Sequence, residues 1–471
     1  MGIFQLIRSG IVFLSIIACL FSTPHAESQS STGKEFWFGF MSNYSDRDRS
    51  VYTAVSISAD TNTKVVVEVP SENWKQEVYL TKDSSVVVTI PKKHTLFHKS
   101  NQIDKKAVHI SSTRNISIVA MNYMSQSADA ALIYPVNSLG TDHILFGFQN
   151  AGRQNEALIV SAKDSTIVTI DKRYTSTKEK VDTIVLMKGE SFLFMRPWDI
   201  SGVVITGSKP VSIFSGVDCA DIPYIPSRRI CCCDHLYEQV PPTTSWGKTF
   251  ITVPYKTRKA DLFRFIAGRD TCKISMNGKY AFTIPPGKSK DTLLSFSTKI
   301  TSSNRLLVAQ MSNGQQFDNV NSDPFYILVS PIEQSINYVT FDAFTARVIR
   351  KYYVNVVLKK NDLKSFFLDG DSTHRQNFMP LEGDSSYVTA QLDIARGRHN
   401  MKCGSDGFNA YVYGYGQYES FGYNAGTKLE ILVDPQKASS NVWIYMVLGA
   451  LILGGGGGYY FYSKNKNKQS T

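Results

Sequence analysis

Short runs of β-branched residues, each followed by a polar turn, recur throughout residues 31–425 and restrict the folds open to this chain. The turns come at intervals of about 8–12 residues, a spacing typical of β-sandwiches and β-barrels. The runs include VSISA (55–59), KVVVEV (64–69), SVVVTI (85–90), ISIVAM (116–121), STIVTI (165–170) and GVVITG (202–207). Because no convincing helical period occurs in this region, we predict an all-β fold.

A longer pattern, in which a strand, a polar turn and a second strand follow one another, recurs four times. Its copies align on Thr63, Thr166, Cys272 and Lys364. Units of roughly 100 residues with about seven strands fit a β-sandwich. We therefore predict four tandem β-sandwich-like modules at 31–146, 147–251, 252–341 and 342–425. Chance similarity between hairpins is one alternative. A large β-propeller is another, disfavoured because no period of about 40–50 residues occurs.

The first 26 residues have the order of a secretory signal peptide. A single charge, Arg8, precedes an apolar run from Ile11 to Phe21, and small residues lead to a cleavage point near Ala26. We predict that residues 1–26 are removed as a leader, with an uncleaved anchor as the alternative.

A second apolar run, Val442–Tyr462, contains 21 residues and no charge. A helix of that length spans about 30 Å, the thickness of the hydrocarbon core of a bilayer. The basic segment 463–471 follows, which places this tail in the cytoplasm. We predict a single-pass type I membrane protein of the plasma membrane, with a juxtamembrane linker at 426–441. A cleaved lipid-anchor signal is the alternative, and the lysines after the run disfavour it.

Five consecutive glycines, Gly454–Gly458, lie inside the predicted span. Small residues let two helices approach closely, so a homodimer through the transmembrane helix is one interpretation. Glycines that a membrane helix merely tolerates are the other.

Composition and motifs exclude several classes of function. The chain is 42% hydrophobic and 19% charged, which is an ordinary globular composition. Its net charge of +11 lies partly in the leader and the tail, so it does not predict nucleic-acid binding. No HExxH, GxSxG or Walker motif occurs. We therefore predict a protein without catalytic residues, metal ligands or cofactor, and not an enzyme.

The cysteines outside the leader are Cys219, Cys231, Cys232, Cys233, Cys272 and Cys403. An even number in an oxidising compartment predicts disulfides, but their spacing does not choose among the pairings. Cys231, Cys233, Asp234 and His235 also suggest a metal site. Because no CxxC pair supports zinc, a disulfide-pinned loop is the better interpretation.

A central motif of the chain resembles a known family. From Lys209 the sequence reads KPVSIFSGVDCADIP, then CCCDHLYEQVPPTTSWGKTFITVP. The later segments FFLDG (366–370), GDSSYVTAQLDIARGRHNM (383–401) and AYVYGYGQYESFGYNAG (410–426) continue the likeness. The chain resembles the N-terminal domain of the IgG Fc-binding protein family over about residues 130–426.

This resemblance implies an extracellular interaction module. By position, Cys219 and Cys233 match the family's two motif cysteines, so it implies a Cys219–Cys233 disulfide, with Cys231 and Cys232 as extra cysteines. It also implies structural roles for Asp234, His235, Trp246 and Gly247. Cys272 and Cys403 remain further disulfide candidates.

Surface features complete the prediction. The sequons at Asn43 and Asn115 predict glycosylation. Basic clusters occur at Lys105–Lys106, at Lys256, Arg258 and Lys259, and at Arg347, Arg350 and Lys351. They suit contacts with acidic glycans, although such clusters are usually a solvated face.

The leading functional hypothesis is a cell-surface protein whose ectodomain binds a protein or glycoprotein ligand, such as an immunoglobulin or a mucin, in adhesion or Fc-type binding. A glycan-binding, lectin-like protein and a non-binding structural surface coat are the alternatives.

Overall fold

The structure is a computed structural model that describes residues 29–43, 52–96, 100–149, 153–173, 180–225, 233–344 and 348–432. The predicted leader, transmembrane span and cytoplasmic tail lie outside these residues. Among the residues described, no helix has both the length and the apolar character needed to cross a membrane. The described residues up to Glu430 form one compact unit, which is all-β as predicted.

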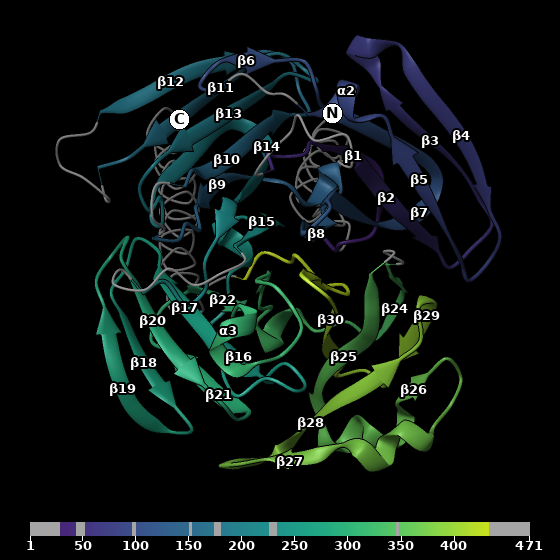
Figure 1. Ribbon diagram of the computed structural model, residues 1–471, viewed down its shortest axis with the longest axis vertical. Coiled ribbons are helices and arrows are strands. Elements are labelled where there is room, and N and C mark those ends of the chain that lie inside the picture. The colour runs from purple at the N-terminus through teal and green to yellow at the C-terminus, as the bar shows by residue number, and fades with distance from the viewer. Residues whose placement is uncertain are drawn as a thin grey trace, which may run out of the picture. The chain divides into compact units, whose positions relative to one another are not determined.

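The first set of strands, purple to blue in Figure 1, forms a seven-stranded antiparallel sheet. Its elements are β1 (Gly33–Phe38), β2 (Tyr52–Ala59), β3 (Thr63–Val69), η1 (Pro70–Glu72), β4 (Trp74–Leu80), β5 (Ser84–Ile90), α2 (Lys92–Thr95), β7 (Val108–Met124), β8 (Ser127–Ile133) and η2 (Val136–Ser138). The first half of the long β7 pairs with β1 and β3, and its second half pairs with β2 and β8. One strand therefore passes through two layers.

The second set repeats this plan around the equally long β14. Its elements are β6 (Ile103–Asp104), β9 (Gly140–Ile144), β10 (Asn155–Ser161), β11 (Thr166–Asp171), β12 (Val181–Leu186), β13 (Ser191–Arg196), β14 (Val204–Ala220), β15 (Asp234–Gln239) and η3 (Thr243–Ser245). The first half of β14 pairs with β9 and β11, and the second half with β10 and β15.

In the third set the two layers are separate four-stranded sheets, β16-β21-β18-β19 and β20-β17-β22-β23. Its elements are β16 (Thr249–Thr252), β17 (Asp261–Ala267), β18 (Cys272–Met276), β19 (Lys279–Ile284), β20 (Ser289–Leu294), β21 (Thr298–Ser302), β22 (Leu306–Met311), α3 (Gln315–Asp318), β23 (Tyr326–Leu328) and η4 (Ile332–Gln334). Here β21 and β22 take the places that the two halves of β7 and β14 hold in the earlier sets.

The fourth set follows the same order with two sheets, β24-β29-β26 and β27-β28-β25-β30-β31. Its elements are β24 (Tyr338–Ala343), β25 (Ile349–Lys359), η5 (Lys360–Ser365), β26 (Phe367–Leu368), η6 (Thr373–Asn377), β27 (Met379–Leu381), β28 (Asp384–Ile394), β29 (Gly397–Lys402), β30 (Phe408–Gly416) and β31 (Glu419–Asn424).

The residues on which the sequence copies align have matching places in the structure. Thr63, Thr166 and Cys272 are the first residues of β3, β11 and β18, whereas Lys364 lies in the 3-10 helix η5. The alternation within these strands explains their burial. In β3, Val65, Val67 and Val69 are buried and the residues between them point outward.

Strand pairing sets the start of each set earlier than the expected boundaries. The strands β9, β16 and β24 pair with β14, β21 and β29, and each therefore belongs to the second, third or fourth set as its opening strand. The expected boundary after residue 146 therefore comes after β9. The boundaries after residues 251 and 341 fall within β16 and β24. The sequence pattern treated each of these strands as the closing element of the set before it.

The last strands of the four sets lie together at the centre of the unit. β8 contacts β15, β15 contacts β23, β23 contacts β31, and β31 contacts β8, so the four strands form a closed cycle. The described ends of the unit also meet. The amide N–H of Ser31 donates to the carbonyl of Thr427 (2.8 Å), and that of Leu429 donates to the carbonyl of Gln29 (3.0 Å).

Candidate functional site

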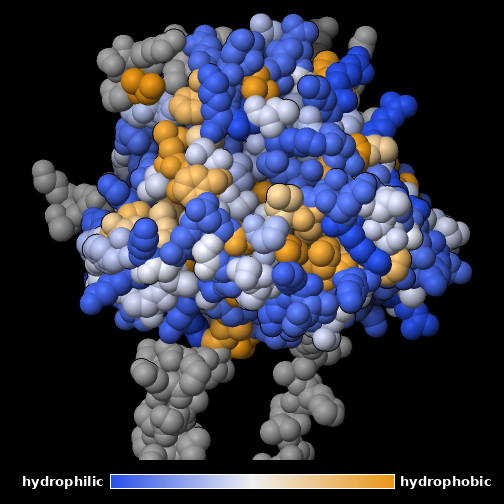
Figure 2. All heavy atoms as spheres, turned by 90° about the horizontal axis from the view of Figure 1, so that it is seen from below, coloured by the Kyte–Doolittle hydropathy of each residue, from blue (hydrophilic) through white to orange (hydrophobic). Residues whose placement is uncertain are grey.

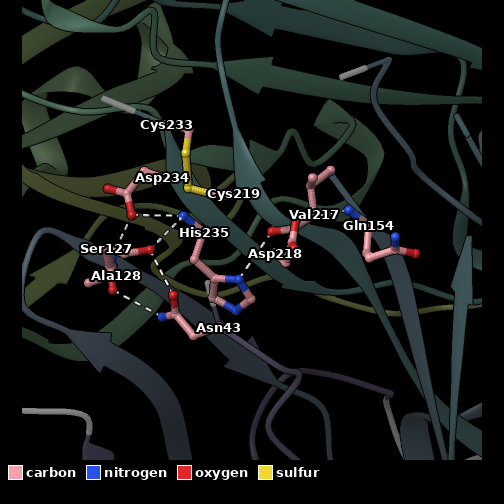
Figure 3. The surroundings of a disulfide bond; sticks show 10 residues. All are labelled: Asn43, Ser127, Ala128, Gln154, Val217, Asp218, Cys219, Cys233, Asp234 and His235. Carbon is pink, nitrogen blue, oxygen red and sulfur yellow. Dashed lines mark hydrogen bonds between the residues drawn. A yellow bond between two sulfur atoms is a disulfide. The ribbon is translucent and has the colours of Figure 1, made fainter. Parts of the chain in front are cut away.

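The cysteine motif connects two neighbouring strands of the second set. Cys219 lies near the end of β14 and Cys233 immediately precedes β15, and the two form a disulfide with a Cα–Cα distance of 5.1 Å (Figure 3). The disulfide implied by the family resemblance is therefore present. Cys231 and Cys232 lie outside the described residues.

Asp234 follows the disulfide and reaches into the first strand set. Its Oδ1 accepts hydrogen bonds from the backbone N–H of Ala128 (2.6 Å) and from that of His235 (2.7 Å), as Figure 3 shows. The carboxyl is fully buried, and burial raises its pKa well above the ordinary value. The nearby carboxyl groups of Asp323, Glu419 and Asp129 raise this pKa further. Asp234 thus links the second set to the first through the hydrogen bonds that its carboxyl oxygen accepts.

His235 is a neutral, buried link between the same two sets. Its Nδ1 lies 3.1 Å from the carbonyl of Val217, so this nitrogen carries the proton and donates it. The other nitrogen, Nε2, accepts from the side-chain amide of Asn122 at 3.1 Å. Burial lowers the pKa of His235 to about 4. Both ring nitrogens are occupied, and the Cys233 sulfur is in a disulfide, so these two residues do not act as metal ligands here.

Trp246 and Gly247 lie where the second set passes into the third. The Trp246 indole is buried and donates to the carbonyl of Pro241 at 3.2 Å. A Cβ added to Gly247 would come within 2.3 Å of the Pro331 Cβ. The pairs Gly33 with Pro135 and Gly140 with Pro242 show the same approach. Glycine is therefore required at this point in three consecutive sets.

Carboxyl groups on the central strands hold the sets together. Asp129, on β8, accepts hydrogen bonds from the backbone N–H of Tyr237 (3.0 Å) on β15 and of Gly422 (3.4 Å) on β31. Glu419, on β31, accepts from the N–H of Gln126 at 3.2 Å, and burial raises its pKa to about 8. These contacts join three sets and were not predicted, because the sequence pattern does not show which strands meet at the centre.

Two predicted features differ from the structure. Cys272 and Cys403, the further disulfide candidates, have free thiols. Cys272 begins β18 with its Sγ 3.4 Å from the Arg305 carbonyl, whereas Cys403 follows β29 with its Sγ 3.7 Å from the Gly404 carbonyl. Asn43 is buried, and its amide donates to the carbonyl of Ser127 (3.0 Å). That contact disfavours a glycan on Asn43, whereas Asn115 is exposed on β7.

The residues of the cysteine motif are thus occupied in holding the fold, and ligand binding has to use the surface. Figure 2 shows one face on which hydrophilic residues predominate and hydrophobic residues form separate patches. The larger hollows include one of about 530 Å³ and one of about 390 Å³, and Thr257 lines both. The sequence signal nearest to them was the pair of basic clusters around Lys256 and Arg350.

The fold and the motif define a class, an all-β protein of linked strand sets in which the Cys219–Cys233 disulfide joins two neighbouring strands. The chain belongs to the IgGFc binding protein family, whose model matches residues 129–414. It is 24% identical over 260 residues to the human (Homo sapiens) IgGFc-binding protein, a match that covers 52% of this chain and 5% of that protein. The chain therefore corresponds to a small part of that relative.

A solved structure titled "Crystal structure of tetra-tandem repeat in extending region of large adhesion protein" is 10% identical and has a TM-score of 0.10. The comparison covers 82% of this chain and 94% of the other. At that score it supports no conclusion about the fold.

Proposed function

We propose that this chain is a cell-surface binding protein whose extracellular region binds a protein or glycoprotein ligand of the immunoglobulin Fc type. The observation that carries the proposal is the family match over residues 129–414, which runs from β8 into β30. It includes β9 to β15 of the second set, the third set and most of the fourth, but only part of β8 from the first. In this proposal the four sets are β-sandwich modules of one repeated plan. They serve as a rigid scaffold, and binding is a property of their exposed loops and edges.

The topology of the proposal comes from the sequence. A leader at 1–26 would export the chain, and the run at 442–462 would anchor it, with 463–471 inside the cell. The Cys219–Cys233 disulfide supports this route, because such bonds persist in oxidising compartments.

The test uses the full-length chain on the surface of transfected cells, with a tag after the leader and another in the tail. Labelled IgG Fc should bind saturably to these cells, whereas the matched Fab fragment should not. Extracellular protease should remove the first tag and spare the second. Protection of the first tag would contradict the topology. Fc-type recognition would be contradicted if Fc and Fab bound equally, or if Fc bound equally to cells that lack the chain.

A further inference from the structure

Two hollows open on either side of one turn at the junction of the third and fourth strand sets. The turn is Tyr255–Arg258, closed by the Arg258 N–H donating to the Tyr255 carbonyl at 3.2 Å. The hollow of about 530 Å³ lies against β28, and that of about 390 Å³ against the start of β25. Because Thr257 lines both, the hollows are neighbours across a single side chain.

Thr257 has a backbone conformation that its side chain disfavours. Its φ is +73°, in the third position of the turn, where glycine or asparagine is usual. A β-branched residue with positive φ is an outlier that persists only where the surroundings impose it. Here the Lys256 N–H donates to the Tyr413 hydroxyl (2.8 Å), and the Tyr255 N–H donates to Asp261 (2.7 Å). These buried contacts hold an exposed threonine between the two hollows.

The smaller hollow is positively charged. Arg350 and Lys351 line it, are exposed, and form no ion pair with any residue in the described part of the chain. Arg350 lies at a register shift between Ile349 and Lys351, a bulge in β25 that re-aims a side chain. The other predicted cations differ. Arg258 is buried against Asp318 (3.0 Å), and Lys256 pairs with Asp393. Of the described cations that line the two hollows, Arg350 and Lys351 therefore remain for a ligand anion.

Hydroxyl and amide groups are the commonest lining of the larger hollow, which also contains the paired Lys256 and Asp393, Met379 and one exposed ring. Thr389 and Gln391 contribute from β28, and Phe296, 53% exposed, contributes from the segment between β20 and β21. The Gln391 amide donates to the Pro254 carbonyl at 2.6 Å, which fixes β28 against the turn. Hydroxyl and amide groups suit a ligand rich in hydroxyls, and an exposed ring can stack on the C–H face of a sugar.

We propose that the two hollows form one binding site for an acidic oligosaccharide. The carboxylate of the terminal sugar lies against Arg350 and Lys351, since guanidinium and carboxylate match as a two-pronged pair. The neutral sugars cross Thr257 and stack on Phe296. An acidic peptide would also suit the cations, but the hydroxyl and amide lining favours a saccharide.

The test measures binding of 3′-sialyllactose to the purified full-length chain in detergent, with lactose as the uncharged control. We expect saturable binding of 3′-sialyllactose that is at least about tenfold weaker in the double variant R350A/K351A, because charge-assisted hydrogen bonds are lost. Phe296→Ala should weaken binding of the same sugar severalfold. Lys279→Ala and Tyr280→Ala, exposed residues on β19 in the third set, are the matched controls and should bind as the parent does.

Equal binding of lactose and 3′-sialyllactose, or unchanged binding by R350A/K351A, would overturn the proposal. So would stronger binding of a glutamate-rich peptide than of the sugar, since that would assign the site to acidic peptides. Unchanged thermal unfolding of each variant shows that the loss is local. The two proposals fail separately: a chain that binds the sugar but not Fc would keep this inference and reject Fc-type recognition.

Discussion

The Nε2 atom of His235 lies 3.1 Å from the side-chain amide of Asn122, across the boundary between the second and first strand sets. Both groups are fully buried, and the Asn122 amide, which also donates to the Met41 carbonyl at 2.8 Å, is the partner of the His235 Nε2. Replacing His235 with Asn should lower the free energy of unfolding by about 1–3 kcal/mol, because a buried donor or acceptor is left unpaired. His374→Asn, at a partly exposed site, is the control for chemical denaturation. Equal stability of the two variants would contradict the role given to His235.

Loss of the disulfide should impair folding more than loss of the imidazole. The bond closes a loop with a sequence separation of 14, for which chain entropy predicts about 3 kcal/mol. We expect Cys219→Ser to reduce delivery to the cell surface, whereas Cys403→Ser, which removes a free thiol, should be exported normally. Peptide mapping without reduction checks the bond directly. Normal export of Cys219→Ser would show that the bond contributes little to folding.

The buried Trp246 should be as sensitive as Cys219. Its indole packs in a core cluster with residues of the second and third sets, among them Ile144 and Ile266. Trp246→Ala should cost about 3–5 kcal/mol, the usual range for a large aromatic removed from a core. Trp246→Phe keeps most of the packing and loses the hydrogen bond to Pro241, so it should cost less. Thermal unfolding that ranks the two variants in the opposite order would contradict this assignment.

Stability should fall as the pH rises from 6.5 to 8. Burial raises the pKa of Glu419 from its ordinary value of 4.5 to about 8, so the folded state holds a proton that the unfolded state has released. Stability from such a group is lost as pH rises through this window, by at most about 1.4 kcal/mol per pH unit. His235 has the opposite sign, since its lowered pKa costs stability only below its ordinary value of 6.5.

Glu419→Gln should reduce the slope of this pH dependence, because an amide cannot ionise. Asp261 and Asp323, whose pKa burial raises to about 7, contribute to the slope that remains. The exposed Glu382→Gln is the control and should keep the parent's slope. Denaturant midpoints of the parent and both variants, measured at pH 6.5, 7.25 and 8 (roughly equal steps across the window), give the three slopes to be compared. A parent that is more stable at pH 8 than at pH 6.5 would show that Glu419 is ionised in the folded protein.

Thr257 should show a conflict between stability and binding. Asparagine tolerates positive φ better than threonine, so Thr257→Asn should raise the free energy of unfolding by about 1 kcal/mol. The same change alters the side chain between the two hollows, so we expect it to weaken sugar binding while it stabilises the fold. Differential scanning calorimetry measures the first effect and 3′-sialyllactose titration the second. A less stable Thr257→Asn variant would indicate that the strain is not relieved.

The local fold was predictable because it depends on neighbours in the sequence. The runs 64–69 and 165–170 coincide with β3 and β11 within a residue or two, since alternation and turns are local signals. Long-range burial was not predictable. Arg258 is one member of a basic cluster in the sequence, yet it is buried against Asp318, 60 residues away in the chain. Asn43 likewise begins a sequon, which predicts an exposed side chain, but its amide donates a buried hydrogen bond to the Ser127 carbonyl.

The pairing of Gln29–Ser31 with Thr427–Leu429 has a mechanical consequence. A pulling force on the four sets would act on the hydrogen bonds between these two segments, which we call the seam. The first and fourth sets would therefore come under tension together. Because the ends are joined, these contacts must break before force can act along the chain, whereas the modules of an open linear array unfold one after another. Single-molecule extension of the full chain should therefore show one cooperative rupture at the seam before any individual set unfolds.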